Sequence, residues 1–391
     1  MEWKEVTLGD FMQCNPKRTI KKGQKARKIT MDLLIPHSKT IRNWNYEPYS
    51  GGAKFQNGDT IMARITPCLE NGKHAFVSIL DEGEIAYGST EYFVFCGKEK
   101  VSDNDFVYYL TKTPLFRDTA IKSMVGSSGR QRAQMDVLEN LKMFVPKDIS
   151  DQRRIASVLS SLDRKIELNN KINADLEEMA QAIFKNWFVD FEPFKDGKFV
   201  DSELGMIPEG WKVGGLFDIA EIFDKKRKPL SGNVREKMDK IYPYYGATSC
   251  MDYVDDYIFD GIYTLIGEDG SVVKENGLPY MQYVWGKMWV NNHAHILQGK
   301  NGYSTEMIHA LLSITNIKFL VTGAVQAKLS QGNMQKIFVA IPPKNVLDEI
   351  RPVIDNLYSK IRINTDENSR LSLLRDTLLP RLMSGELEVP E

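Results

Sequence analysis

Two stretches of the chain carry apolar residues at mostly alternating steps of four and three positions. In the first stretch the series consists of Ile155, Leu159, Leu162, Ile166, Asn169, Leu176, Met179 and Ile183. In the second it consists of Ile350, Ile354, Leu357, Ile361, Asn364, Leu371, Leu374 and Leu378. This spacing is typical of helices that pack along an apolar seam, as in a coiled coil. It predicts one long helix over residues 150–190 and another from residue 345 toward the C-terminus.

The sequence also indicates how these helices end. No glycine or proline interrupts residues 150–190. Pro352 lies near the start of the second helix, where proline is tolerated. We expect this second helix to stop around Pro380, followed by a last short turn and by Gly385 as a terminator.

Asn169 and Asn364 occupy equivalent positions in the two seams. An asparagine in an apolar seam costs stability but can fix register and pairing, so we predict that both take part in helix pairing. The alternative is that each faces solvent where the seam is irregular. Side by side, two helices of roughly 50 Å would form a rigid spacer, at about 1.5 Å per residue. A pairing of each helix with another chain is equally compatible with the pattern.

The remaining segments have the pattern of mixed α+β domains. The run 59–65 alternates after the turn Asn57-Gly58, and 92–95 and 263–266 are short β-type runs between glycine turns. A few helical segments intervene, such as 305–312. These features predict twisted sheets with long loops.

Sequence motifs repeat at the ends of both globular segments. Residues 3–10 and 211–218 share Trp-Lys, then Leu five positions after Trp and Asp two further on, and residues 138–146 parallel 334–342. We expect an α+β protein of two globular domains joined by two long helices that form an antiparallel coiled coil, arranged as a pseudo-twofold repeat. The predicted parts are the first domain at 1–149, the first helix at 150–190, the second domain with its entry linker at 191–344, and the second helix with the C-terminal tail at 345–391.

Composition narrows the class of protein. The 391 residues include 51 Lys plus Arg and 52 Asp plus Glu, so a net charge of -1 excludes a global electrostatic attraction to nucleic acid. No apolar run approaches about 18 residues, and the first residues are too charged for a secretory signal. The four cysteines lie far apart without a C-x-x-C pair. We expect a reduced, cytoplasmic protein with no zinc site and no membrane association.

Motifs of nucleotide-dependent enzymes are missing from the sequence. There is no G-x-x-x-x-G-K-[ST] loop, and no G-x-G-x-x-G follows a predicted strand. Residues 341–344 approach the Asp/Asn-Pro-Pro-aromatic motif of amino-methyltransferases but lack its polar and aromatic residues. His293 and His295 would share one face of a strand, yet no third metal ligand lies nearby in the sequence. We predict a recognition protein with no catalytic, cofactor-binding or metal-binding residues of its own.

Positive charge is concentrated in matching segments of the two halves. Residues 17–28 hold seven positive charges and no negative one, and Lys225–Lys228 lie at the matching place after Trp211. A single charge run is usually only a solvated face, but one repeated in both halves of a neutral protein favours binding to DNA phosphates. If these runs are only solvated, the alternative function is a coiled-coil structural scaffold.

Each half also contains a polar-basic stretch, 126–132 and 323–328, whose small residues let a backbone approach phosphate. Arginine and glutamine can read the edges of guanine and adenine. The tyrosines around Pro243 could contact sugar or base, and a packing role is equally compatible with their position. The candidate DNA-binding residues are Lys17, Arg18, Lys21, Lys22, Arg130, Gln131, Arg132, Lys225, Lys226, Arg227, Lys228, Tyr244, Tyr245, Gln326 and Lys328.

A set of degenerate motifs runs in order along essentially the whole chain. They are Gly58–Lys73, Gly88–Tyr92, Gln152–Ala156, Ile183–Phe188, Leu204–Trp211, Tyr242–Ala247, Asn291–Ala294 and Leu378–Gly385. Each motif is weak alone, but the ordered set is specific. On these motifs the chain resembles the specificity (S) subunit of type I restriction-modification enzymes. The first two look like the family's first target recognition domain, and Leu204–Trp211 looks like the entry to its second.

The resemblance implies a function and a set of partners. Each target recognition domain would read one half of a bipartite double-stranded DNA sequence through the major groove, and the helices would set the length of the unread gap. Two methylation subunits carrying S-adenosylmethionine would dock on the chain, and restriction subunits with ATP and Mg²⁺ would complete the endonuclease. Phe184, Trp187 and Phe188 are candidate docking residues, with packing between helix and domain as the alternative. The family's recognition domains diverge strongly, so our DNA-contact residues rest on charge and loop position.

Overall fold

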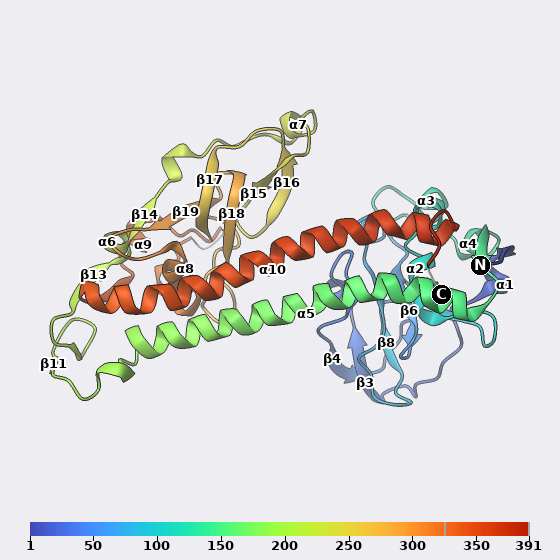
Figure 1. Cartoon of the computed structure of the whole chain (residues 1–391), viewed down its shortest axis with the longest axis horizontal. Helices are drawn as coiled ribbons and strands as arrows, with labels where there is room; N and C mark the ends of the chain where they lie inside the picture. The colour runs from blue at the N-terminus through green and yellow to red at the C-terminus, as the bar shows by residue number, and fades with distance from the viewer. Residues whose placement is uncertain (324–325, 390–391) are drawn as a thin grey trace. The chain divides into compact units, whose positions relative to one another are not determined.

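The computed structural model describes residues 1–323 and 326–389, and the chain divides into two compact units (Figure 1). Unit 1 comprises Met1–Asn170 together with the residues from Thr365 onward, and unit 2 comprises Lys171–Asn364. Each unit contains one α+β domain and a part of each of two long helices. The boundary between the units therefore falls within the helices and not at their ends.

The domain of unit 1 is built on two four-stranded sheets. The first has the antiparallel order β2 (Met12–Cys14), β9 (Tyr92–Gly97), β6 (Thr60–Ala63) and β7 (His74–Phe76). The second has the order β4 (Asn45–Pro48), β3 (Lys25–Ile29), β8 (Ala86–Gly88) and β5 (Lys54–Phe55). Strand β1 (Trp3–Thr7) pairs with β10 (Lys142–Pro146) and closes the domain. Its helices are α1 (Leu8–Phe11), η1 (Met31–Leu33), α2 (Asn104–Leu110), α3 (Pro114–Lys122) and α4 (Met135–Glu139).

The domain of unit 2 is built on one six-stranded sheet. Its order is β14 (Ala220–Ile222), β19 (Ala294–Gly299), β17 (Phe259–Gly267), β18 (Met281–Val290), β15 (Tyr242–Tyr245) and β16 (Cys250–Val254). Two further strand pairs are β11 (Phe199–Val200) with β12 (Ile207–Pro208), and β13 (Lys212–Gly215) with β20 (Phe338–Ile341). Its short helices are η2 (Glu192–Phe194), α6 (Leu216–Ile219), η3 (Asp224–Lys226), α7 (Gly232–Arg235), α8 (Thr305–Ile314), η4 (Lys318–Leu320) and α9 (Gln331–Met334).

The two domains share one strand order. The sequence β2-β9-β6-β7 of unit 1 corresponds to β14-β19-β17-β18 of unit 2, and the pair β1–β10 corresponds to β13–β20. The registers agree as well, because Lys4 lies opposite Val145 and the equivalent Lys212 lies opposite Ile341. The repeat that the tryptophan motifs predicted is therefore present in the fold.

Helices α2 and α8 hold equivalent places against these sheets, on β9 and β19. The side chains of Asp103 and Ser304 cap their first turns by accepting hydrogen bonds from the backbone N–H groups of Phe106 and Met307. Five consecutive residues of α2, Phe106–Leu110, are buried, so this helix is enclosed on all sides. The two helices thus fix β9, which directly follows Glu91, and β19, which contains His295.

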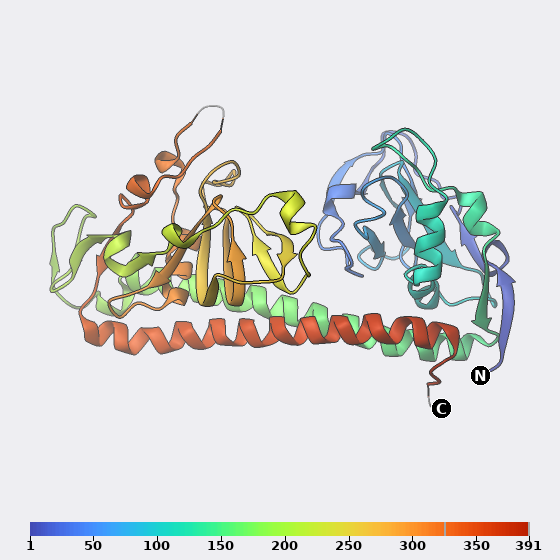
Figure 2. The ribbon, with the colours of Figure 1, turned by 90° about the horizontal axis from the view of Figure 1, so that it is seen from above.

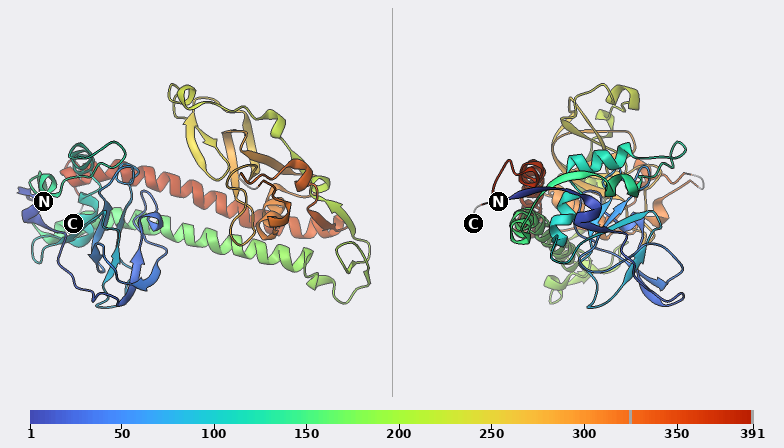
Figure 3. Two further views of the ribbon diagram at one scale, coloured as in Figure 1. Left: turned by 180° about the vertical axis from the view of Figure 1, so that it is seen from behind. Right: turned by 90° about the vertical axis from the view of Figure 1, so that its right-hand side faces the viewer.

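The long helices α5 (Ile149–Phe188) and α10 (Lys344–Ser384) lie side by side and run in opposite directions within each unit (Figure 3). In unit 1, Lys165 pairs with Glu367 at 3.2 Å. In unit 2, the amide of Asn364 donates to Asn173 Oδ1 at 2.9 Å. The antiparallel coiled coil is therefore formed within the chain. Among the residues that the structure describes, neither these helices nor the shorter ones combine the length and the apolar character of a membrane span.

The C-terminal end of α10 corrects one prediction. The helix does not stop around Pro380 but continues to Ser384, and Gly385 ends it with a φ of +78° in the left-handed region. A proline removes one backbone hydrogen bond of a helix. Here the burial of Leu382 and Met383 in the core of unit 1 holds the last turn helical in spite of that loss.

A buried ion pair attaches both long helices to the domain of unit 1. Arg375 of α10 and Asp163 of α5 lie 2.6 Å apart, and both side chains are 7% exposed. The hydroxyl of Tyr109, in α2, donates to the same carboxylate at 2.6 Å. Unit 2 attaches α10 by a comparable triad, in which Arg362 pairs with Glu306 at 2.6 Å and Tyr283 donates to Glu306 at 2.8 Å.

Candidate nucleic-acid interface

One loop occupies the same place in each domain. In unit 1 it runs from Val125 to Arg132, and the backbones of these two residues exchange N–H···O bonds at 3.0 and 2.9 Å. In unit 2 it runs from Thr322 to Lys328, which exchange the same bonds at 2.9 and 2.7 Å. We name these segments loop A and loop B. Figure 2 shows each loop on the side of its own domain that faces away from α5 and α10.

Both loops are also bound to the residues that follow equivalent strands, β6 and β17. Four backbone hydrogen bonds make this connection, two in each unit. They are Thr66 N to Gln131 O (3.0 Å), Ala133 N to Arg64 O (2.8 Å), Gly270 N to Ala327 O (3.0 Å) and Leu329 N to Glu268 O (2.8 Å). The identical pattern shows that the two polar-basic stretches predicted from the sequence are equivalent loops, although their side chains differ.

Loop A presents both free and paired side chains. Arg130 is exposed and forms no ion pair with another described residue, and Gln131 is half-buried. The guanidinium of Arg132 bonds Glu91 at 2.7 Å, and Arg64 reaches the same carboxylate at 3.2 Å. Hydrogen bonds from Arg132 lower the pKa of the Glu91 carboxyl below its usual value. Arg132 still has a side chain that is 41% exposed, so it can contact a phosphate without leaving Glu91.

Loop B presents Gln326 and Lys328, and both residues are exposed. The ammonium of Lys328 lies 3.6 Å from Glu268, a weak pair at a side chain that is 54% exposed. Ala324 and Val325, which belong to the predicted stretch 323–328, lie outside the described residues.

The basic run of unit 1 divides into free lysines and one structural arginine. Lys17, Lys21 and Lys22 are exposed and form no ion pair within the described part of the chain. Arg18 instead pairs with Asp59, and the two side chains are 13% and 2% exposed. The DNA contact predicted for Arg18 is not supported, because withdrawing its guanidinium would leave a buried carboxylate uncompensated.

The basic run of unit 2 divides in the same way. Lys225, Lys226 and Lys228 are exposed around the short helix η3. Arg227 is only 12% exposed, and its guanidinium bonds Glu268 at 2.6 Å and the carbonyl oxygen of Ala294 at 2.8 Å. The DNA contact predicted for Arg227 is therefore corrected to a structural role within the domain.

The tyrosines of β15 also differ from one another. Tyr244 is 2% exposed, and its hydroxyl oxygen accepts a hydrogen bond from the backbone N–H of Leu230 at 3.0 Å. Tyr244 therefore packs inside the domain and is not exposed to DNA. This agrees with the packing role that the sequence left open for these tyrosines. Tyr245 is half-buried, and burial raises the pKa of its hydroxyl to about 12.

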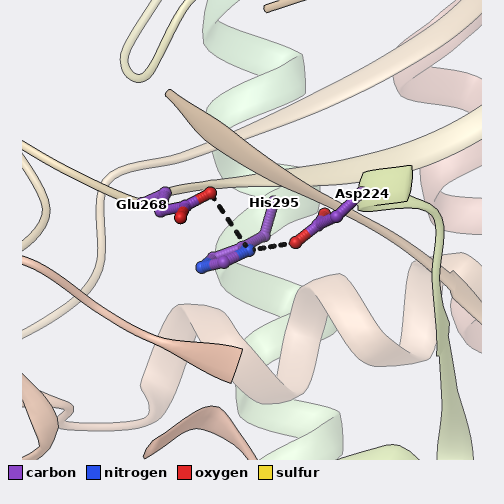
Figure 4. Close-up of side chains that lie close together, drawn as sticks. All are labelled: Asp224, Glu268 and His295. Carbon is purple, nitrogen blue, oxygen red and sulfur yellow. Dashed lines mark hydrogen bonds and ion pairs between the residues drawn. The ribbon is translucent and has the colours of Figure 1, made fainter. Parts of the chain in front are cut away.

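Asp224, Glu268 and His295 form a cluster of charged side chains in unit 2 (Figure 4). The ring nitrogen Nδ1 of His295 lies 2.5 Å from an Asp224 oxygen and 3.7 Å from a Glu268 oxygen. Three such groups could hold a metal ion, but the Arg227 guanidinium already lies 2.6 Å from Glu268 and 3.4 Å from Asp224. We therefore interpret the cluster as an ion-pair network.

The sequence did not reveal this cluster, since its members lie far apart along the chain. The histidine pair singled out by spacing is also divided in the structure. His293 is half exposed and pairs with Asp269 at 2.5 Å, while His295 is buried. Only the fold brings Asp224, at the start of η3, next to β19.

The comparison with known families agrees with this duplicated architecture. The sequence profile of the type I restriction modification DNA specificity domain matches residues 1–178 and 208–373. The chain belongs to this family. The two matched segments contain one globular domain each, so the specificity subunit carries the family's domain twice.

Named relatives support the same assignment. The specificity subunit is 28% identical over 312 residues to the type I restriction enzyme MjaIX specificity subunit of Methanocaldococcus jannaschii, covering 74% of this chain and 70% of that protein. It is 24% identical to the HindI specificity subunit of Haemophilus influenzae, covering 99% and 100%. The crystal structure of an S subunit from M. genitalium has the same fold, with a TM-score of 0.53, 15% identity and coverage of 98% and 96%. The chain is thus a non-catalytic specificity subunit of a type I restriction-modification system.

The two predicted helix-pairing asparagines of the specificity subunit are buried, at 0% exposure for Asn169 and 1% for Asn364. In unit 1, Asn169 Nδ2 donates to Asn368 Oδ1 at 2.9 Å. In unit 2, Asn364 donates to Asn173 at the same distance. Since Asn173 and Asn368 are also equivalent in the repeat, these two asparagine pairs between α5 and α10 correspond to one another. In unit 1, Asn368 also donates to Asn170 Oδ1 at 3.0 Å. A role of these pairs in setting the register stays a prediction.

Replacing both asparagines of the unit 1 pair, in Asn169→Leu with Asn368→Leu, is expected to raise the free energy of unfolding by about 1 kcal/mol, because apolar packing replaces a polar pair. Each single substitution is expected to lower it by about 1–2 kcal/mol, because the remaining amide loses one of its two hydrogen-bond partners and keeps only Glu367, for Asn169, or Asn170, for Asn368. Urea unfolding of the three variants measures these changes. Single effects that simply add up in the double variant would contradict coupling across the helices.

The predicted docking residues are mostly part of the core of unit 2. Phe184 and Phe188 are 2% and 6% exposed, and their rings stack with centroids 4.5 Å apart. Trp187 is half-buried against Phe194, at 5.8 Å between ring centroids. The docking prediction is not supported for the two phenylalanines. They are four residues apart, so they lie on the same face of α5, and that face packs in the core of unit 2.

Exposed apolar side chains lie elsewhere on the long helices. In unit 1, Leu168 and Leu374 are 53% and 47% exposed. In unit 2, Ile363 and Met179 are 57% and 50% exposed. Ile363 is the repeat equivalent of Leu168, and Leu374 that of Met179. For Leu168 and Ile363 the signal was present in the sequence, since both are apolar at equivalent positions outside the seam. Met179 and Leu374 were predicted to belong to the seam, and their exposure corrects that prediction.

Proposed function

We propose that this specificity subunit recognises a bipartite sequence in double-stranded DNA, with each domain reading one half. The observation that carries the proposal is the equivalence of loops A and B. Duplicated domains present basic loops in the same place, held by the same hydrogen bonds, but with different side chains. Two domains that bind DNA in the same way, but contact the bases with different side chains, would recognise a target of two different half-sites.

The side chains divide into two roles under this proposal. The exposed lysines of both basic runs, which are Lys17, Lys21, Lys22, Lys225, Lys226 and Lys228, would neutralise phosphates and position the domain. Arg130 and Gln131 of loop A and Gln326 of loop B would contact base edges, because arginine pairs with guanine and glutamine with adenine in the major groove.

The exposed apolar residues of α5 and α10 support the docking of partner subunits. Leu168 with Leu374 in unit 1 and Met179 with Ile363 in unit 2 are equivalent sets, so a partner that binds one set finds a second copy of it. Two methylation subunits fit this repeat, and they would supply S-adenosylmethionine. Restriction subunits that use ATP and Mg²⁺ would join the same assembly.

A matched insertion tests whether the helices set the gap between the half-sites. Four residues are inserted after Lys171 in α5 and four after Asp366 in α10, which are equivalent positions between the two asparagine pairs. Each insertion adds about 6 Å of helix, which corresponds to about two base pairs of DNA. We expect methylome sequencing of cells with the whole system to show both half-sites unchanged and the gap about two base pairs longer.

Insertion in α5 alone is the control. It separates the asparagine pairs of the two helices, and we expect a loss of stability and of methylation instead of a new gap. A matched insertion that leaves methylation intact with the original gap would contradict the spacer role. Methylation without any defined sequence would contradict the proposed function itself.

A further inference from the structure

A single buried side chain in unit 2 bonds the residues that adjoin the basic run and loop B. His295 lies in β19 and is 1% exposed. Its Nδ1 lies 2.5 Å from Asp224 Oδ2, and its Nε2 lies 2.6 Å from the carbonyl oxygen of Leu329. Figure 4 marks the contact with Asp224 by a dashed line. Asp224 directly precedes the basic run Lys225–Lys228, and Leu329 directly follows loop B. The imidazole therefore ties both segments to the same strand.

The hydrogen-bond partners determine the protonation state of this imidazole. A carbonyl oxygen can only accept, so Nε2 must carry a proton toward Leu329. The Asp224 carboxylate already accepts from the backbone N–H of Ile296 at 3.0 Å and from Gln331 Nε2 at 2.7 Å. A carboxylate surrounded by donors is ionised and can only accept, so Nδ1 must carry a proton as well.

The Asp224 carboxyl supports this assignment. Burial by itself would raise its pKa, but the hydrogen bond from His295 and the positive charges of His295 and Arg227 outweigh burial and lower the pKa. The aspartate is therefore anionic at neutral pH. His295 is then a buried imidazolium between an anion and a carbonyl dipole.

We propose that His295 is a positioning residue for DNA recognition by unit 2. As an imidazolium it holds the basic run and loop B in the arrangement that meets DNA, and the loss of one proton releases one of the two segments. The part of this inference that concerns DNA rests on the proposed function. The protonation state and the hold on loop B do not depend on it.

The charged groups around His295 determine the direction of the pH dependence. Asp224 and Glu268 face it as anions, and Arg227 and Lys328 approach Glu268 as cations, at 2.6 and 3.6 Å. Because the pKa of the Asp224 carboxyl is lowered, the change of charge that we propose belongs to the imidazole. Both hydrogen bonds are complete at low pH, and one is lost as the pH rises.

The unit offers a matched control for this histidine. His293 lies two positions away on the same segment, but its side chain is 48% exposed and pairs only with Asp269. Its side-chain partner, Asp269, belongs neither to the basic run nor to loop B. His293→Gln therefore removes a histidine charge from the same surface, while His295→Gln removes the buried one.

The first test is independent of DNA. Nitrogen chemical shifts of the full chain, labelled with ¹⁵N-histidine and assigned through the two variants, report the protonation of each ring nitrogen. We expect both nitrogens of His295 to be protonated at about pH 7. Hydrogen–deuterium exchange of the peptide that contains Leu329 is expected to accelerate, beyond the intrinsic pH effect, as the imidazolium is lost. A neutral imidazole at about pH 7, or exchange that follows only the intrinsic pH effect, would overturn the proposal.

The second test uses the complex with the methylation subunits and its own methylated target, identified beforehand by methylome sequencing. Affinity is expected to fall about tenfold between about pH 7 and about pH 9, since a charge-assisted hydrogen bond is lost. His293→Gln should keep this fall. Glutamine in His295→Gln keeps a hydrogen-bond donor but carries no charge that changes with pH. The affinity of this variant complex for the DNA target should therefore not change between about pH 7 and about pH 9. An equal change of DNA affinity with pH in the wild-type, His293→Gln and His295→Gln complexes would overturn the positioning role.

These tests separate two kinds of failure. If the wild-type complex shows no sequence preference at any pH, the proposed function is wrong, while nitrogen shifts and exchange still decide the state of His295. If the complex binds its target but His295→Gln does not fold, the pH-dependent exchange of loop B in the wild-type chain decides the proposal by itself.

Discussion

In an Asp163→Ala variant we expect unit 1 to lose about 3–5 kcal/mol of its free energy of unfolding, because the buried Arg375 guanidinium then keeps only the exposed Asp376 carboxylate as its anionic partner. Arg375 and Asp163 lie 2.6 Å apart at 7% exposure each, and Tyr109 donates to the same carboxylate. One substitution thus removes the buried carboxylate that both groups share and that joins α2, α5 and α10. Urea unfolding followed by helical circular dichroism measures the loss.

Asp376→Ala is the control for this experiment. Asp376 bonds the same guanidinium at 2.9 Å, but its side chain is 59% exposed. Water and salt screen such a pair, so we expect a change below about 1 kcal/mol. Similar losses in the two variants would show that burial is not what makes the Asp163 pair important.

The second large effect concerns DNA. With Lys225, Lys226 and Lys228 replaced by alanine, the affinity of the complex for its target is expected to fall roughly a hundredfold at about 0.15 M salt, since each lost phosphate contact reduces the salt slope by about 0.9. The slope of log K against log salt should therefore decrease by about 2.7. Arg227 stays in place, because it bonds Glu268 and supports the fold. Fluorescence anisotropy over a salt series measures both quantities.

A charge-matched variant controls for net charge. Lys195, Lys198 and Lys212 are also exposed and belong to unit 2, but they lie around the strand pairs β11–β12 and β13–β20. Their replacement by alanine changes the net charge by the same amount. We expect the salt slope to stay unchanged in that variant. An equal decrease in both variants would mean that the basic run is only a solvated face.

Much of the architecture could be read from local pattern. Apolar spacing predicted both long helices, and α5 begins and ends within two residues of the predicted 150–190. The repeat of short motifs predicted the duplicated fold. The end of α10 was missed because local rules put the stop around Pro380, whereas core packing around Leu382 and Met383 keeps the helix intact.

The candidate site was predictable only in part. The positions of the basic runs and of loops A and B followed from charge and from the repeat. Within each basic run, however, the sequence did not show which cations are exposed and which form structural ion pairs. Lys17 and Lys226 are exposed, whereas their neighbours Arg18 and Arg227 are paired. The difference lies in carboxylates, Asp59 and Glu268, that are about forty positions away along the chain and adjacent only in the folded domain.

The sequence by itself therefore determined the order of parts, their duplication and the segments that carry charge, because periodicity and repeats are properties of neighbouring residues. Only the tertiary structure decided which basic side chains are exposed without an ion pair to a described residue, and which phenylalanines are buried in the core. It also decided that His295 lies between Asp224 and Leu329. Burial and ion pairing depend on residues that are far apart in the sequence and adjacent in the fold. A local sequence pattern does not predict which of these residues come into contact.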